Sequence, residues 1–195
     1  MIIITLKLKD VNKPFEDYPK AVERWMGNKP FCRRCGGLFK KNGTYKRSYS
    51  VHREIYFFQV QRILCKQCGK SHALLPCNLI PYSIIGAIER EKVLRKYGEK
   101  AVIERIAEEI DVAPRTVSGW CRRFSRQTRE IIDWVSKHLA AHFSEINWLK
   151  GALLEGRDRV FWVLKLLDLF REYFFPEFPH GSLSLLNFLA YEFLI

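Results

Sequence analysis

The sequence has no run of apolar residues long enough to span a lipid bilayer, which takes about 20. Its most apolar stretch, residues 159–175, carries five charged side chains, and the longest uncharged run within it is Val160–Leu164. The first residues also lack the features of a secretory signal, because no basic segment precedes the apolar start and no small-residue cleavage site follows it. We therefore expect a cytoplasmic protein with no membrane partner, in which disulfides are not favoured.

Acidic residues are scarce in two segments. The whole chain of 195 residues has a net charge of +12. Residues 29–75 contain eleven lysines or arginines and one acid, Glu54, and residues 114–129 contain five arginines and no acid. Such an excess predicts an anionic partner, most often nucleic acid. A membrane surface would satisfy the same charge, so the location of the protein decides between the two.

The composition is that of a folded chain, since 48% of the residues are hydrophobic and 14% aromatic. Its length suits one compact unit or two small ones. We predict an α+β fold in which a small zinc ribbon of antiparallel strands precedes a mainly helical region. The expected domains are an N-terminal strand and short helix over residues 1–28, a zinc ribbon over 29–82, a helix-turn-helix over 83–126 and a C-terminal helical region over 127–195.

Four of the six cysteines form two CxxC pairs, each followed by glycine. The pairs are separated by a hairpin-sized segment, and four thiolates delivered two by two suit a tetrahedral zinc ion. The predicted ligands are Cys32, Cys35, Cys65 and Cys68. Between the pairs we expect strands at Thr44–Val51 and Glu54–Leu64, with Asn42-Gly43 as a turn signal before them. A closed set of four protein ligands leaves no position for a catalytic water, so this zinc is expected to be structural.

Other readings of the cysteines remain open. A dithiol redox site would need only one CxxC, at the start of a helix that follows a strand. Mixed ligation is a second alternative, because His72 and Cys77 follow the second pair, although a complete set of four cysteines favours both as bystanders. Cys121 stands alone in a helical pattern and is expected to be a small core residue.

Residues 102–124 have the pattern of a helix-turn-helix. Apolar residues at helical spacing predict a first helix around residues 103–110, and Pro114 suits the first position of a second helix. Asp111 lies in the turn, where glycine is common, and aspartate tolerates a left-handed backbone better than most residues. The expected buried face of the second helix consists of Val117, Trp120, Cys121 and Phe124.

The other face of the second helix is basic and polar. It contains the predicted DNA-binding residues, namely Arg115, Thr116, Ser118, Gly119, Arg122, Arg123 and Arg126. A recognition helix presents such a face to the major groove, with N-terminal residues near base edges and later arginines near phosphates. The alternative is an ordinary helical hairpin whose basic face is simply solvated.

The C-terminal third predicts further helices at Ser125–Phe143, Val160–Phe174 and Ser182–Ile195. A helical core is the default interpretation, and a homodimer interface is the sharper hypothesis. Asp158 and Asp168 lie on an apolar helical pattern and are expected to face solvent or form salt bridges. The apolar C-terminus also leaves open that the chain is a truncated form of a longer protein.

The segment from Arg62 to Cys68, followed by His72-Ala73-Leu74-Leu75-Pro76 and Leu79-Ile80-Pro81-Tyr82, resembles an uncharacterised bacterial family that combines CxxC pairs with a helix-turn-helix. That family is similar in turn to the N-terminal DNA-binding region of insertion-sequence transposases. The resemblance covers about residues 30–125 and implies DNA binding without an established activity. The residues that follow are too few for a nuclease domain with two metal ions, so we predict no catalytic residues.

The leading hypothesis is therefore a zinc-stabilised protein that binds double-stranded DNA, either as a regulator or as a stand-alone relative of a transposase's end-binding region. An interaction module that docks on a polymerase or transposase subunit is the alternative from a different class. A nuclease or transposase fragment acting in trans is the third.

Overall fold

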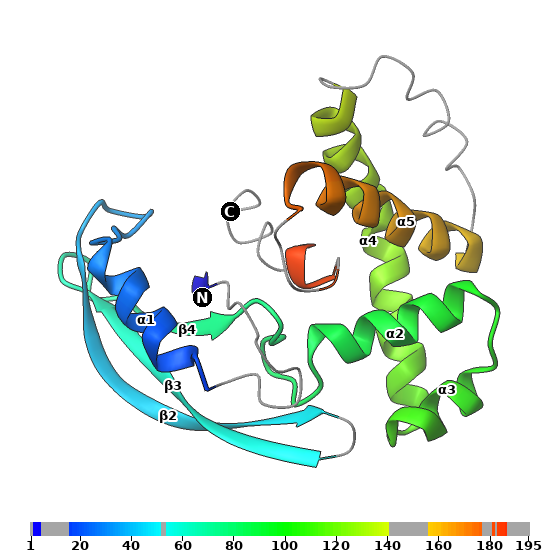
Figure 1. The fold of residues 1–195 in the computed structure, drawn as a ribbon, viewed down its shortest axis with the longest axis horizontal. Helices are drawn as coiled ribbons and strands as arrows, with labels where there is room; N and C mark the ends of the chain where they lie inside the picture. The colour runs from blue at the N-terminus through cyan, green and yellow to red at the C-terminus, as the bar shows by residue number, and fades with distance from the viewer. Residues whose placement is uncertain are drawn as a thin grey trace. The chain divides into compact units, whose positions relative to one another are not determined.

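The computed structural model describes residues 2–4, 16–51, 54–140, 156–176, 181 and 183–186. The chain divides into two compact units, Met1–Ala87 with Ser184–Ile195, and Ile88–Leu183. The strands of the described chain all lie in the first unit and four helices follow them along the chain, so the predicted α+β class is confirmed (Figure 1). No helix among the described residues is both long and apolar enough to cross a membrane.

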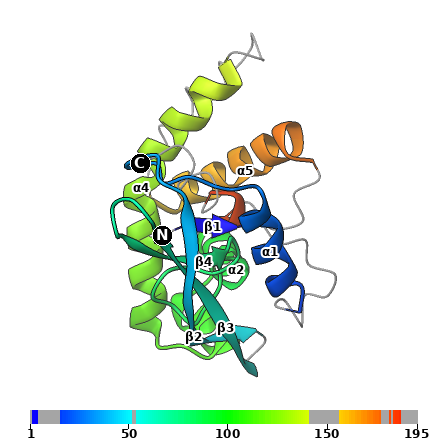
Figure 2. The ribbon, with the colours of Figure 1, turned by 90° about the vertical axis from the view of Figure 1, so that its left-hand side faces the viewer.

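The first unit is built on a four-stranded sheet. Its elements are β1 (Ile2–Ile4), α1 (Tyr18–Gly27), β2 (Phe39–Val51), β3 (Glu54–Cys65) and β4 (Ser71–Pro76). The strand order is β1-β4-β3-β2, with β1 parallel to β4 and the other pairs antiparallel. Figures 1 and 2 show β2 and β3 as a long, curved hairpin.

The centre of the sheet is buried on both faces. Leu74 and Leu75 are successive residues of β4 and both are fully buried, although neighbouring side chains of a strand point to opposite faces. Leu74 packs in a cluster with Tyr18 of α1, whereas Leu75 belongs to a second cluster with Tyr49 and Val60. A strand buried on both sides lacks the polar–apolar alternation of an exposed strand, which explains why sequence analysis did not predict β4.

Tyr18 fixes α1 to the sheet through its hydroxyl group. The hydroxyl donates to the carbonyl oxygen of Leu74 at 2.8 Å and accepts from the amide of Gln61 at 2.9 Å. Burial raises the pKa of Tyr18 to about 12, against the smaller lowering effect of the Gln61 amide. Both polar functions of the phenol are thus used inside the core.

Asn42-Gly43 is not a turn, contrary to the sequence prediction. Both residues lie inside β2, where the pairing with β3 shifts register between Lys41 and Thr44. Gly43 has φ 72°, and a bulge of this kind uses a left-handed residue that glycine supplies at little cost. Pairing resumes on both sides of the bulge, so β2 begins at Phe39 rather than at Thr44.

The second unit contains the helical region. Its helices are α2 (Ala87–Gly98), α3 (Ile103–Ile110), α4 (Pro114–Ala140) and α5 (Gly156–Phe174). The expected helix over 125–143 is the continuation of α4, and its last three residues lie outside the described residues. Of the expected helix over 182–195, the structure describes only residues 183–186, which are helical.

A charged network joins α2 to α5. The Arg95 guanidinium donates two hydrogen bonds to Asp168, at 3.0 and 2.7 Å, and further bonds to Glu91. Glu91 also accepts from the amide of Leu183 at 2.9 Å. Burial alone would lower the pKa of Arg95, but the bonds to Asp168 and Glu91 outweigh it and raise that pKa. Asp168 is thus salt-bridged, which is one of its two expected environments.

Candidate metal centre and helix-turn-helix

Two similar turns present the cysteines. In the first turn the amides of Cys35 and Gly36 donate to the carbonyl of Cys32 at 3.2 and 2.7 Å, and in the second the amide of Gly69 donates to the carbonyl of Cys65 at 3.1 Å. Gly36 and Gly69 have φ of 73° and 68°. Glycine after each CxxC therefore supplies the left-handed residue that closes the turn.

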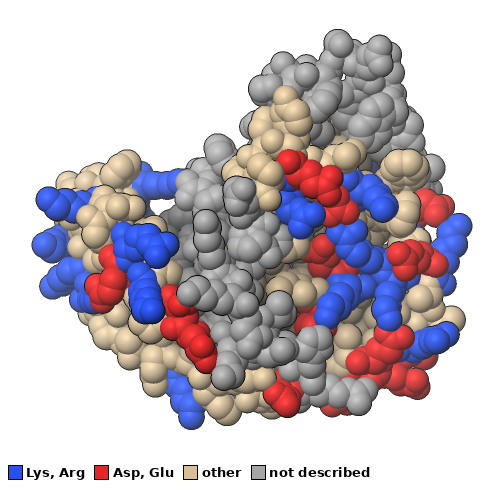
Figure 3. All heavy atoms as spheres, viewed as in Figure 1, with Lys and Arg blue, Asp and Glu red and all other residues tan. Residues whose placement is uncertain are grey.

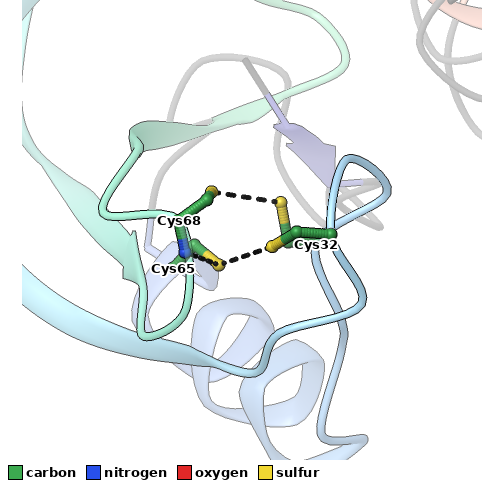
Figure 4. Close-up of side chains that lie close together, drawn as sticks. Cys32, Cys65 and Cys68 are labelled. Carbon is green, nitrogen blue, oxygen red and sulfur yellow. Dashed lines mark hydrogen bonds between the residues drawn. The ribbon is translucent and has the colours of Figure 1, made fainter.

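The four sulfur atoms converge on one point. The Sγ atoms of Cys32 and Cys68 are 3.9 Å apart, those of Cys35 and Cys65 are 3.4 Å apart, and all four lie within 4.8 Å of one another (Figure 4). A tetrahedral ion with metal–sulfur bonds of about 2.3 Å, the value for zinc, requires sulfur–sulfur distances of about 3.8 Å. The donor set and its spacing thus fit a four-coordinate metal ion.

The surroundings of two thiols in the cluster shift their pKa values in opposite directions. The amide of Cys68 lies 3.5 Å from the Sγ atom of Cys65 and, against burial, lowers the pKa of Cys65 to about 6. The backbone of Gly37 lowers the pKa of Cys35, but burial and hydrogen bonds with the other three thiols outweigh it and raise that pKa to about 11. The thiolate of Cys65 therefore forms readily, whereas an ion is needed to draw the proton from Cys35.

Gly37 is required for the two turns to approach each other. A Cβ atom on Gly37 would lie 2.5 Å from the Cβ atom of Gln67 and 3.0 Å from the Sγ atom of Cys65. These distances are too short for a relaxed side chain. The second glycine of the sequence Cys35-Gly36-Gly37 is therefore explained by contact between the turns and not by its backbone angle.

Among the described residues, the cluster consists of the four CxxC cysteines, and His72 and Cys77 are not part of it. The ring of His72 packs edge-on against Phe39, with centroids 5.7 Å apart. Burial lowers the pKa of His72. Cys77 is fully buried in the first unit. Both side chains therefore take part in the packing of the strand unit.

Helices α3 and α4 are joined by a short turn at the position that the sequence predicts for a helix-turn-helix. Asp111 ends α3 in the left-handed region at φ 55° and ψ 54°, as expected for the turn, and Pro114 is the first residue of α4. Val117, Cys121 and Phe124 are buried on the inner side of α4. Burial raises the pKa of Cys121 to about 11, against the smaller effect of Arg157, which agrees with a core thiol.

The predicted DNA-binding residues all lie on α4. Ser118 is half-buried and the other six are exposed, namely Arg115, Thr116, Gly119, Arg122, Arg123 and Arg126. Within the described residues, none of the four arginines forms an ion pair with a carboxylate. Sequence analysis missed Arg129, which is also exposed and follows Arg122 by seven residues, two helical turns along the same face.

The strand unit carries a second set of exposed basic residues. Figure 3 shows several lysine and arginine side chains, with some acidic ones among them, on the side of the molecule that carries α1 and the strands. The exposed basic residues of the strand unit include Arg33, Lys40, Lys46, Arg62, Lys66 and Lys70. Lys46 lies over the ring of Phe57, 4.3 Å from its centroid, and Phe57 itself is 62% exposed. The strand unit thus presents exposed basic side chains together with exposed aromatic rings, among them Phe31 and Phe57.

Comparison with known proteins identifies one matching segment. Residues 32–120 match a domain of unknown function (DUF6431). The match begins at the first cysteine of the metal centre and ends within α4. No curated protein and no solved structure matches the chain. The match agrees with the resemblance to an uncharacterised domain family, while the similarity to transposases stays a prediction.

Proposed function

We propose that this chain is a zinc-stabilised DNA-binding protein that places α4 in the major groove of duplex DNA. The observation that carries the proposal is the row of exposed, unpaired arginines on one helix immediately after a helix-turn-helix turn. Arg115 and Arg129 are 14 residues apart, which corresponds to about 21 Å of helix. Beyond Arg129 the exposed residues Glu130 and Asp133 are acidic, so the row of arginines on α4 ends at Arg129.

Zinc is the metal that suits the cysteine centre best. Four thiolates favour a soft or borderline ion over magnesium or calcium, and the spacing of the sulfurs is close to that of a tetrahedral zinc site. With four protein ligands the ion has no open position, so its role is to hold the two turns and α1 around the end of the β2–β3 hairpin. We propose no catalytic role for the protein.

The basic side chains of the strand unit would contact the phosphate backbone. Exposed lysines and arginines that contact phosphates add affinity without sequence preference, because they release counterions from the duplex. Base reading would then fall to the first turns of α4, where Arg115 and Ser118 lie near the helix N-terminus. A cytoplasmic regulator and the end-binding part of a mobile element would both use this arrangement, and a homodimer would suit a symmetric site.

A binding selection tests the proposal. The full-length protein would be incubated with random duplex DNA, bound molecules would be amplified, and affinity for the selected motif would be measured over a range of salt. We expect Arg115→Ala and Ser118→Ala to relax the selected motif, because they lie where base edges are read. Arg122→Ala and Arg123→Ala should keep the motif but reduce the salt dependence, by about 0.9 in the log–log slope for each lost phosphate contact. If all four variants bind DNA as the wild-type protein does, α4 does not read the DNA sequence.

One observation favours the alternative of a protein-interaction module. Ile55 and Phe57 are successive outward residues of β3 and are 58% and 62% exposed. Large exposed apolar side chains are common at protein interfaces. If the selection yields no motif and moderate salt abolishes all binding, the charge is non-specific and this alternative is preferred. Substitution of Phe57 would then weaken the partner complex and leave DNA binding unchanged.

A further inference from the structure

Arg90 on α2 is an arginine with no counter-charge. Its guanidinium carbon lies 4.6 Å from the centroid of the Trp120 ring on α4. Its Nε atom is buried without a hydrogen-bond partner, and within the described residues no hydrogen bond occupies the rest of the guanidinium. Desolvation costs a charged group free energy when nothing offsets it, so this arrangement calls for an explanation.

The neighbouring carboxylates of α2 are already used. Glu89 accepts from Lys92 at 3.0 Å, and Glu91 is engaged by Arg95 and by the amide of Leu183. Neither acid pairs with Arg90, although both are adjacent to it in the sequence, because successive helical residues face different directions. The charge of Arg90 is thus not neutralised from its own helix.

A second positive charge lies beside Arg90. Arg123 follows Trp120 by three residues on α4, which places the two side chains next to each other on the helix surface. Burial, and to a smaller extent the charge of Arg123, lower the pKa of Arg90 to about 10. Arg90 and Arg123 are thus both neighbours of Trp120, and among the described residues neither forms an ion pair with a carboxylate.

The geometry points to a phosphate-binding site formed by Arg90 and Arg123, in which the two guanidinium groups share one phosphate of the DNA backbone while Trp120 holds Arg90 in place. Guanidinium groups bind phosphate oxygens through paired N–H donors. The incoming phosphate supplies the missing counter-charge. This inference rests on the proposed function and adds to it a contact made by α2, outside the helix-turn-helix pair.

Salt-dependent binding of full-length variants to duplex DNA tests the inference. The variants are Arg90→Gln, Arg123→Gln and the double variant, because glutamine keeps a planar polar group without the charge. Lys92→Gln is the matched control, since it removes the same charge from α2 at a residue paired with Glu89. Arg90→Lys tests whether the charge alone restores the contact. Thermal unfolding of each variant monitors the fold.

If both guanidinium groups hold one phosphate, the double variant should reduce the log–log salt slope by about 0.9, the value for one phosphate. Its loss of affinity should be smaller than the product of the two single losses, because each single variant already disrupts the shared contact. Arg90→Lys should recover most of the slope. Lys92→Gln should bind DNA more tightly than Arg90→Gln at every salt concentration.

Three results would overturn the site. Equal affinities of Arg90→Gln and Lys92→Gln would show that Arg90 makes no special contact. A slope reduced by about 1.8 in the double variant, with multiplying losses, would mean that each arginine binds its own phosphate. An Arg90→Gln variant with a lowered melting temperature and wild-type DNA binding would assign Arg90 a structural role. If the wild-type protein binds no duplex DNA, the proposed function itself is refuted.

Discussion

Substitution of Gly119 separates the stability of α4 from its proposed contact with DNA. Gly119 is the sixth residue of α4 and is exposed, and a Cβ atom at this position would meet no atom within 4 Å. The helix therefore has room for a side chain. Glycine inside a helix is less favourable than alanine by about 0.8–1.0 kcal/mol, so its presence on an open surface is a cost to the fold.

Gly119→Ala should stabilise the helical unit by up to about 1 kcal/mol. For a unit of about 100 residues, 1 kcal/mol corresponds to a rise in melting temperature of about 4–8 °C. Gly119→Glu should also raise the melting temperature, by less, because glutamate is a somewhat weaker helix former than alanine. Calorimetry of the metal-loaded protein measures both values.

The effect on DNA binding should have the opposite sign. A carboxylate about 6 Å from a phosphate costs about 0.7 kcal/mol in a dielectric of 80 and about 2.8 kcal/mol in a dielectric of 20. Gly119→Glu should therefore weaken DNA binding by about threefold to about 100-fold, most strongly at low salt. Lys92→Gln lowers the net charge by the same amount on α2 and provides the control.

Each half of this reasoning can be refuted separately. A lower melting temperature of Gly119→Ala would mean that the space around Gly119 is occupied. A Gly119→Glu variant that binds DNA as well as Lys92→Gln would mean that this face of α4 points away from the duplex. If Gly119 allows the backbone of α4 to approach DNA closely, its substitution should increase stability and weaken binding together.

Two further predictions concern the strand unit. Cys65→Ser should give an insoluble or partly unfolded strand unit, because it removes one of the four proposed metal ligands. A variant that keeps its metal by elemental analysis and has an unchanged melting profile would contradict a structural metal site. Tyr18→Phe should destabilise the protein by about 1–3 kcal/mol, because it leaves the carbonyl of Leu74 and the amide of Gln61 unpaired in the core. Since the pKa of Tyr18 is raised from 10.0 to about 12, its contribution should be complete below about pH 10 and lost as the pH rises toward 12; a variant as stable as wild type below pH 10 would contradict it.

The local features of the fold were predictable because their signals are local. A CxxC followed by glycine encodes a complete turn within six residues, and the two turns meet as their spacing predicted. Asp111 and Pro114 similarly mark the end of α3 and the start of α4 through their own backbone preferences. In these cases a short segment contains most of the physical information that determines its conformation.

The bulge at Asn42-Gly43 shows how a local signal can mislead. The dipeptide favours a left-handed backbone in any context, and the structure uses that conformation within β2 instead of at its start. The decision between a turn and a bulge depends on where β3 pairs, which the dipeptide does not encode. Tertiary pairing thus selects among conformations that the local sequence permits.

Arg90 illustrates the same limit for the residues of the proposed DNA contact. In the sequence it lies between two glutamates, and an i,i+4 pattern on α2 would suggest an ordinary surface helix of alternating charges. Only the packing of α2 against α4 places it on Trp120 and beside Arg123. Sequence analysis therefore identified the basic face of α4 but could not find Arg90, which α2 contributes to the proposed contact.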